Sequence, residues 1–439
     1  MIAHTNGAHG REEARPSQSA QGSTACYLGR EPVSVFFLAS VAATVALVAT
    51  AALLRSRAYA VFRGVTLGLH TLIASALLPQ LSSATPVFVY LHVTVYLSAL
   101  ALIRPRLRGL VYRALVSLPA AFFSAGTLLA FPWAIAGSLG FEPWAPWLPY
   151  VAAFVGLLQS LSSRDEEVDV VVADGHSVDG LQRVRRGKAR TARPLRIVQI
   201  TDPHLGPFMS VRRLRRICER AVARQPDLVV LTGDFLTMES QRDPSYLATA
   251  LEPLKALSGR TFACLGNHDH EALDTVQSAL RSAGVRLLVD RAVEVDTLAG
   301  PVQLVGMDFS WRNRTAHLKS VCVRHPRRPG ALRVVLLHDP GAFKRMPAGE
   351  ADLVLSGHTH GGQVGLVSLG LPWTMLRVLM NAPDHGFWAR GTDRLYVHRG
   401  TGHYGFPLRL GVPAEQSLLR VHALRGADVL PLAHHGGAS

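Results

Sequence analysis

The stretch Gly357-His358-Thr359-His360-Gly361-Gly362-Gln363 decides how the rest of the chain is interpreted. It follows the apolar run Asp352-Leu353-Val354-Leu355, which predicts a buried strand. Residues two apart on a strand point to the same face, so both imidazoles face one side. The glycines that follow let the backbone turn sharply and approach another group closely. Two neutral imidazoles on one face suit a metal ion, although His-x-His also occurs as ordinary loop or core histidine.

Four other predicted strands end in the same kinds of residue. The strand 196–201 precedes Asp202-Pro203-His204, 228–232 precedes Gly233-Asp234, 261–265 precedes Gly266-Asn267-His268-Asp269, and 333–337 precedes His338-Asp339. Ligands of α/β sheets collect outside the carboxyl ends of strands, so these ends predict one shared site. Carboxylate, amide and imidazole groups together suit a pair of divalent transition ions. Each motif alone is more often a turn or a cap, whereas all of them in this order indicate metal binding.

The ordered motifs D-x-H, G-D, G-N-H-D, H and G-H-T-H resemble those of the calcineurin-like metallophosphoesterase superfamily, over about residues 195–423. The stretch 395–402 (LYVHRGTG), with Arg409-Leu410 and Pro413-Ala414-Glu415 after it, is similar to the bacterial membrane-linked YkuE/YaeI-like branch. This resemblance implies a domain of two packed mixed β-sheets flanked by helices, the metallophosphoesterase sandwich, with a dinuclear metal centre.

The resemblance also implies a role for each motif residue. One ion would be held by Asp202, His204, Asp234 and His360, and the second by Asp234, Asn267, His338 and His358. The two divalent ions would be Mn, Fe or Zn. They would stabilise the attacking and leaving oxygens while metal-activated hydroxide attacks phosphorus. The catalytic residue His268 would protonate the leaving group, with Asp269 orienting it.

Three further residues are candidates to bind substrate. Arg312 and Arg314 follow the predicted strand 302–307 and could hold a second phosphate bidentately, the alternative being solvated loop charges. His403 follows a glycine-rich turn and is expected to line the pocket.

The first third of the chain has a different composition. Five apolar segments carry almost no charge: 33–54, 64–81, 86–103, 110–136 and 144–161. Their lengths lie near the ~20 residues that a membrane span needs. A soluble helix needs a polar face, which these segments lack. We expect a disordered polar tail at 1–31, a transmembrane region of four to five helices at 32–161, and a basic linker at 162–194. A metallophosphoesterase domain at 195–425 and a flexible tail at 426–439 would follow.

Arginines set the expected orientation. They gather in the loops 55–63 and 104–113 and again after residue 164, and the positive-inside rule places all three on the cytoplasmic side. The catalytic domain would then lie in the cytoplasm, on a bacterial inner membrane, although Arg11, Arg15 and Arg30 in the outer tail run against the rule. The four cysteines show no Cys-x-x-Cys spacing and predict neither a disulfide framework nor a zinc knuckle.

The leading interpretation is a membrane-anchored phosphodiester or pyrophosphate hydrolase. The formal charge of +15 suits an anionic substrate, and a lipid-linked one such as UDP-diacylglucosamine, used by some relatives in the branch, is a candidate. A nuclease or nucleotide phosphodiesterase is the alternative enzyme, but nucleic acid is disfavoured because no aromatic-interleaved groove accompanies the charge. A membrane sensor or transporter with a regulatory phosphoesterase domain is the non-enzyme alternative, disfavoured because the spans lack Asp, Glu and Lys.

Overall fold

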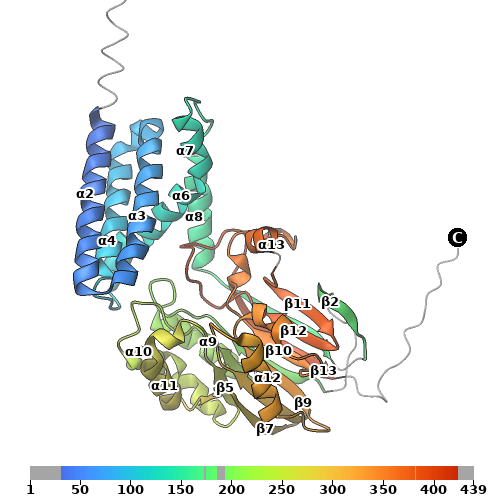
Figure 1. Ribbon diagram of the computed structural model, residues 1–439. Coiled ribbons are helices and arrows are strands. Elements are labelled where there is room, and N and C mark those ends of the chain that lie inside the picture. Colours follow the sequence, from blue (N-terminus) through green and yellow to red (C-terminus); the bar gives the residue numbers. More distant parts are fainter. Residues whose placement is uncertain (1–30, 173–174, 185–192, 381, 424–439) are drawn as a thin grey trace, which may run out of the picture.

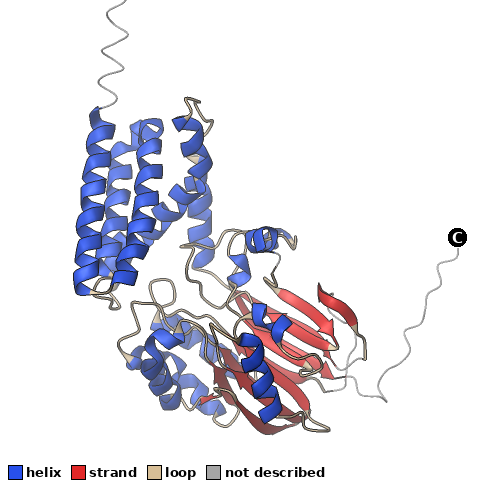
Figure 2. Ribbon diagram, in the orientation of Figure 1, coloured by secondary structure: helices blue, strands red, loops and turns tan. Residues whose placement is uncertain are grey.

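The computed structural model describes residues 31–172, 175–184, 193–380 and 382–423. A bundle of apolar helices stands against one end of an α/β domain, in which two sheets pack face to face between helices (Figures 1 and 2). The predicted fold class, apolar helices followed by a two-sheet domain, is confirmed. The predicted tails at 1–31 (except Glu31) and 426–439 lie outside the described residues.

Helices occupy all five apolar segments. They are α2 (Glu31–Leu54), α3 (Arg57–Leu77), α4 (Thr85–Ala101), α5 (Leu110–Tyr112), the π-helical turn Arg113–Ser117, α6 (Leu118–Leu129), α7 (Phe131–Ser138) and α8 (Leu148–Ser160). Within the described residues, three helical stretches are long and apolar enough to cross a membrane: Ser34–Leu54, Arg57–Ala101 and Leu110–Leu129. The second contains both α3 and α4, joined by 3-10 turns over Leu78–Ala84. Helix α8 has 13 residues, fewer than the ~20 of a full span.

The outer surface of the bundle is apolar. Large side chains such as Val45 and Leu53 are 63% and 84% exposed, which is costly in water and favourable in lipid. The chain is therefore suited to association with a membrane.

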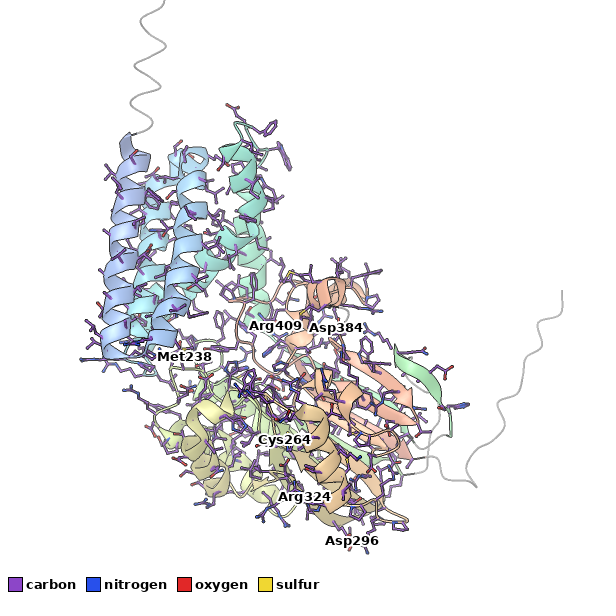
Figure 3. The ribbon with its side chains drawn as sticks, viewed as in Figure 1. Met238, Cys264, Asp296, Arg324, Asp384 and Arg409 are labelled. Carbon is purple, nitrogen blue, oxygen red and sulfur yellow. The ribbon has the colours of Figure 1, made fainter. Side chains whose placement is uncertain are left out.

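Arginine-bearing turns lie at the end of the bundle that meets the α/β domain. Arg55 follows α2, and its guanidinium donates to Sδ of Met238 over 3.2 Å. Figure 3 shows Met238 next to this end of the helices. Arg106 and Arg108, after α4, line a hollow together with Arg212 of the domain. The basic turns and the α/β domain thus share one side of the bundle.

The α/β domain contains two mixed sheets. One has the order β1-β13-β3-β4-β5-β6 and the other β2-β11-β12-β10-β9-β8-β7. The strands are β1 (Arg164–Val172), β2 (Val178–Arg183), β3 (Leu195–Ile200), β4 (Leu228–Thr232), β5 (Thr261–Cys264), β6 (Arg286–Leu287), β7 (Arg291–Thr297), β8 (Gly300–Met307), β9 (Leu332–Leu337), β10 (Leu353–Ser356), β11 (Gly386–Gly391), β12 (Asp393–Val397) and β13 (Glu415–Ala423). Strands β3, β4 and β5 run parallel, as do β9 and β10, so their carboxyl ends lie on one edge of the domain.

Alternating strand residues build separate cores on the two faces of each sheet. Ile197 and Leu228 pack toward the other sheet, whereas Val198 and Val229 pack toward the helices. The helices that cover the first sheet are α9 (Val211–Ala223), α10 (Pro244–Leu251) and α11 (Leu273–Ser282), and α12 (Arg314–Arg324) covers the second. Burial on both faces explains why these strands read as continuous apolar runs.

Two strands of the sandwich, β1 and β2, lie within the segment predicted as a basic linker, 162–194. Strand β1 pairs with β13 in parallel from Arg164 to Val172, and β2 pairs with β11 at the edge of the second sheet. Val168 and Val170 are buried, so the apolar residues after the charged start of β1 complete the inner core. The basic run at 185–192 lies outside the described residues.

Candidate metal centre and active site

Five strand ends bring the predicted ligands together. Residues Asp202, His204 and His360 form one group, and Asp234, His338 and His358 form another. Within each group the ligand atoms all lie within 4.8 Å of one another. The two groups contain six of the seven residues for which the family resemblance implies metal binding; the seventh is Asn267.

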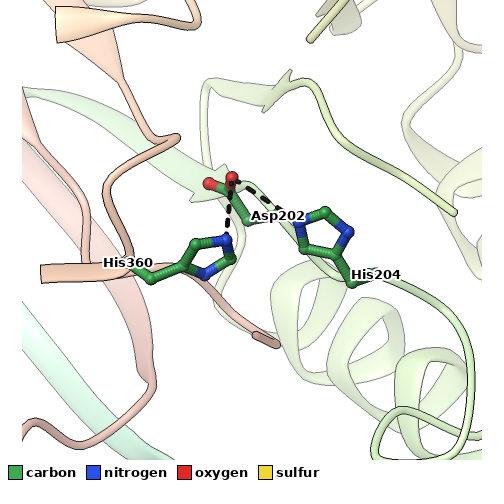
Figure 4. Close-up of side chains that lie close together, drawn as sticks. All are labelled: Asp202, His204 and His360. Carbon is green, nitrogen blue, oxygen red and sulfur yellow. Dashed lines mark ion pairs between the residues drawn. The ribbon is translucent and has the colours of Figure 1, made fainter. Parts of the chain in front are cut away.

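Figure 4 shows the first group converging from β3 and β10. The Nε2 atoms of His204 and His360 lie 4.0 and 3.7 Å from Oδ1 of Asp202. These separations exceed hydrogen-bond lengths, so the three side chains face a shared space without forming hydrogen bonds to one another.

The second group adjoins the first through Asp234. Its Oδ2 lies 3.2 Å from Nε2 of His338 and 3.6 Å from Nε2 of His204. Nδ1 of His338 donates to the Thr232 carbonyl over 2.6 Å, which holds the ring in place and directs Nε2 into the site. Nδ1 of His358 lies 3.2 Å from that same Nε2. Asp234 is therefore placed to serve both groups.

Backbone strain is concentrated in the ligands. Five of the ten non-glycine residues with positive φ in the described part of the chain are predicted ligands, with φ of 43° to 68°: Asp202, His204, Asp234, His358 and His360. Such conformations cost about 1–3 kcal/mol each and persist where the surrounding structure enforces them, commonly at functional sites. The close packing also explains a glycine: a Cβ on Gly357 would lie 2.1 Å from Oδ2 of Asp202.

The donor set fits divalent metal ions. Both ring nitrogens of His204 and Oδ1 of Asn267 are buried without a hydrogen-bond partner, an arrangement that costs about 1–3 kcal/mol per group unless something binds there. Burial lowers the pKa of His204 to about 3 and that of His358 to about 4, so both imidazoles are neutral, the form that binds metal. Burial opposes ionisation of Asp234, but the charge and hydrogen bond of His338 lower the pKa of its carboxyl.

His268 lies beside these groups, with a different partner from the one predicted. Its Nδ1 is 2.8 Å from Oε1 of Glu271, and its backbone N–H donates to Oδ1 of Asp234 over 2.9 Å. Burial alone would lower the pKa of His268, but the hydrogen bond that it donates to Glu271 and the charge of Asp234 raise it. Glu271 therefore orients this imidazole.

The predicted orienting role of Asp269 is corrected by the structure. Its buried carboxylate accepts backbone N–H groups of Asp234, Phe235 and Gly266 over 2.8, 2.8 and 2.7 Å. A side chain that points back into the loop cannot also hold the ring of its neighbour. Asp269 instead clamps the β4 and β5 loops that carry the ligands.

The three predicted substrate-binding residues lie in different surroundings. Arg314 forms an ion pair with Asp339 and packs over the Phe309 ring, 5.0 Å from its centroid. Arg312 is exposed in the loop just before Arg314, the first residue of α12. His403 is buried against Phe208 and lines a cavity that also reaches His204 and His268.

Sequence reasoning missed residues that close the site. Tyr404 stacks on His204 and stands edge-on to His268, with both ring-centroid distances 5.0 Å. The buried Arg409, labelled in Figure 3, donates to the carbonyls of His360 and Arg399. Gln363 donates to the carbonyls of Phe406 and Leu408 over 2.6 and 3.1 Å, which ties the ligand loop to the 403–408 loop. The only sequence signal for Tyr404 was its place next to His403.

Comparisons with known proteins agree with this centre. Residues 195–362 match the family model for calcineurin-like phosphoesterases. Phosphodiesterase YaeI of Escherichia coli is 30% identical over 236 residues, which cover 52% of this chain and 83% of that protein. An uncharacterized metallophosphoesterase of Aquifex aeolicus is 32% identical, with 52% and 85% covered. A transmembrane protein with a metallophosphoesterase domain from Bos taurus is 30% identical, with 52% and 53% covered. The chain therefore belongs to the calcineurin-like phosphoesterases and is a metal-dependent phosphoesterase.

Proposed function

We propose that the protein is a membrane-anchored hydrolase that cleaves a phosphodiester or pyrophosphate bond at two divalent ions. The observation that carries this proposal is the pair of ligand groups joined by Asp234. Adjacent two-ion sites stabilise both the attacking and the leaving oxygen of an in-line displacement. Water supplies the oxygen of the new P–O bond, and the other half of the substrate leaves with the bridging oxygen.

The ligands divide between the ions as follows. Asp202, His204, Asp234 and His360 would hold one, and Asp234, Asn267, His338 and His358 the other. When bound, the ions would supply Lewis acidity and lower the pKa of a water molecule toward neutrality. Mn, Fe and Zn are the candidate ions for this mixture of carboxylate, amide and imidazole ligands.

His268 acts on the leaving group in this proposal. Glu271 occupies Nδ1, so Nε2 is the nitrogen that carries the proton to the leaving oxygen. The raised pKa keeps a larger fraction of the imidazole protonated at neutral pH than in water. Tyr404 lies over His204 and edge-on to His268, and so limits water beside the transferred proton.

The helix bundle supports a membrane location and an amphiphilic substrate. Its outer surface is apolar, and its basic turns lie on the side of the α/β domain, as expected for a catalytic domain in the cytoplasm of a bacterial cell. A lipid-linked pyrophosphate such as UDP-diacylglucosamine is a specific candidate substrate.

The test uses the full chain, purified in detergent and stripped of metal by a chelator. We expect turnover of bis(4-nitrophenyl) phosphate or UDP-diacylglucosamine to return when Mn²⁺, Fe²⁺ or Zn²⁺ is added, with about two ions bound per chain. Single-stranded DNA serves as the comparison substrate for the nuclease alternative. Failure of every cation to support hydrolysis of either phosphoester would refute the proposal.

A further inference from the structure

A cavity of about 480 Å³ joins the metal centre to the helix bundle. On the domain side it is lined by His204, His268, His403 and Tyr404. On the bundle side it is lined by Phe62 and Arg63 of α3, Val95 of α4, and Ala120, Ala121 and Ser124 of α6. The helices that suit the membrane therefore form one wall of the space above the ligands.

The helix side of this cavity is suited to an apolar chain. Ala120, Ala121 and Ser124 are small, so α6 leaves room where larger residues would fill it. Phe62 and Val95 add apolar surface, and Phe208 packs beneath His403 at a ring-centroid distance of 4.5 Å. Each methylene removed from water adds to the binding free energy, so a long chain would gain substantially from this space.

A second hollow of about 420 Å³ adjoins the cavity. The two share Ser98, Leu102, Ser117, Pro207 and Glu239 in their linings. The second is basic, because Arg106, Arg108, Arg113 and Arg212 line it. Nε of Arg113 is buried and makes no hydrogen bond to the described residues, so this guanidinium can still donate to a bound anion.

From these observations we propose that the helix bundle is half of the substrate site. The cavity holds the alkyl or acyl chain of the phosphoester that is cleaved, and the basic hollow holds a further anionic group of the same molecule. The inference rests on the proposed function, which it deepens by naming an amphiphilic substrate with an apolar chain and a second anion. Glu239 lines both spaces, and its carboxylate disfavours an anion where they meet.

The apolar half is tested with methyl and octyl 4-nitrophenyl phosphate on the full chain in one detergent. We expect kcat/KM to be at least about tenfold higher for the octyl ester, from burial of its methylenes. Ala121→Trp and Ser124→Trp should each reduce the octyl-to-methyl ratio toward one. Leu128→Trp is the matched control, since Leu128 lies on the same helix and is exposed. All proteins share one micelle, so a change in the ratio reports the cavity.

The outcomes separate the inference from the proposed function. Wild-type protein that cleaves both esters with equal kcat/KM overturns the inference and leaves the metal-dependent hydrolysis standing. An octyl preference that both tryptophan variants retain also overturns the inference and leaves the metal-dependent hydrolysis standing. Absence of metal-dependent cleavage of either ester refutes the proposed function, and the inference with it.

The anionic half is tested with octyl diphosphate, followed by phosphate release. Arg113→Gln should lower kcat/KM for octyl diphosphate about tenfold, the loss of one charge-assisted contact, and affect octyl 4-nitrophenyl phosphate much less. Arg104→Gln is the control, because Arg104 is exposed in the same turn region and lines neither space. Equal losses on both substrates would overturn the assignment of the hollow.

Discussion

The candidate active site has two surfaces, here called the floor and the helix wall, and they leave different signals in the sequence. The floor consists of the seven predicted ligands, each within a few residues of a strand end. The helix wall consists of Arg63, Val95, Ala121 and their neighbours on α3, α4 and α6, which lie about 80 to 140 residues before the first ligand in the sequence. The floor has the residue types that chemistry requires, whereas the wall has residues common in any apolar helix.

The contrast separates two kinds of specificity. In the proposed site a floor residue would hold an ion at the phosphoryl group, which every substrate shares, so its loss should affect all substrates alike. A wall residue would touch the part that differs between substrates, so its loss should change their ranking. Substitutions at either surface test this distinction between general and substrate-dependent effects.

The largest effect is expected for Asp234→Asn. The substitution removes a charge placed between both ligand groups, so metal-dependent turnover should fall to background for methyl and octyl esters alike. Metal content measured by mass spectrometry should fall in parallel. A variant that still cleaved one ester well would show that the floor does not serve all substrates equally.

The next effect is expected for His268→Gln. Removing a general acid costs about 10²–10⁴-fold, and the loss should be larger for alkoxide than for 4-nitrophenolate leaving groups, which need no proton. Glu271→Gln should show the same dependence on the leaving group, more weakly, because it acts through the His268 ring. Metal content should not change in either variant. Equal losses for good and poor leaving groups would exclude the acid role.

A smaller effect, on stability, is expected for Asp269→Asn. The amide can still accept hydrogen bonds at one end, but its NH₂ group faces a backbone donor at the other. We expect a loss of about 2–3 kcal/mol, and a melting midpoint lower by several degrees. Glu271→Gln, at an exposed neighbouring position, should leave the midpoint unchanged. If Asp269→Asn melted normally, the clamp would contribute little.

The extent of sequence prediction follows the same division. Strand β4 was predicted with the observed bounds, because continuous apolar runs ending in Gly-Asp are a local signal. Strand β11, with the sequence GFWARG, was missed, since its glycines and arginine hide the alternation. The pairing of β1 with β13 joins residues about 250 apart, and no local pattern reports it. Glu271 was missed because its neighbour Asp269 was the more obvious carboxylate to orient the His268 ring.

The smallest effect on activity is expected for Arg312→Ala. Arg312 is exposed, and exposed substitutions change stability by less than about 0.5 kcal/mol. Its kcat/KM should stay within about twofold of wild type on octyl diphosphate if the second anion lies in the basic hollow instead. Arg314→Ala is the informative comparison, because Arg314 pairs with Asp339 and packs on Phe309, which lies 6.3 Å from the His358 ring. It should lower the melting midpoint without changing the octyl-to-methyl ratio. A loss with Arg312→Ala confined to octyl diphosphate would place the second anion in this loop and transfer part of substrate recognition from the helix wall back to the sandwich.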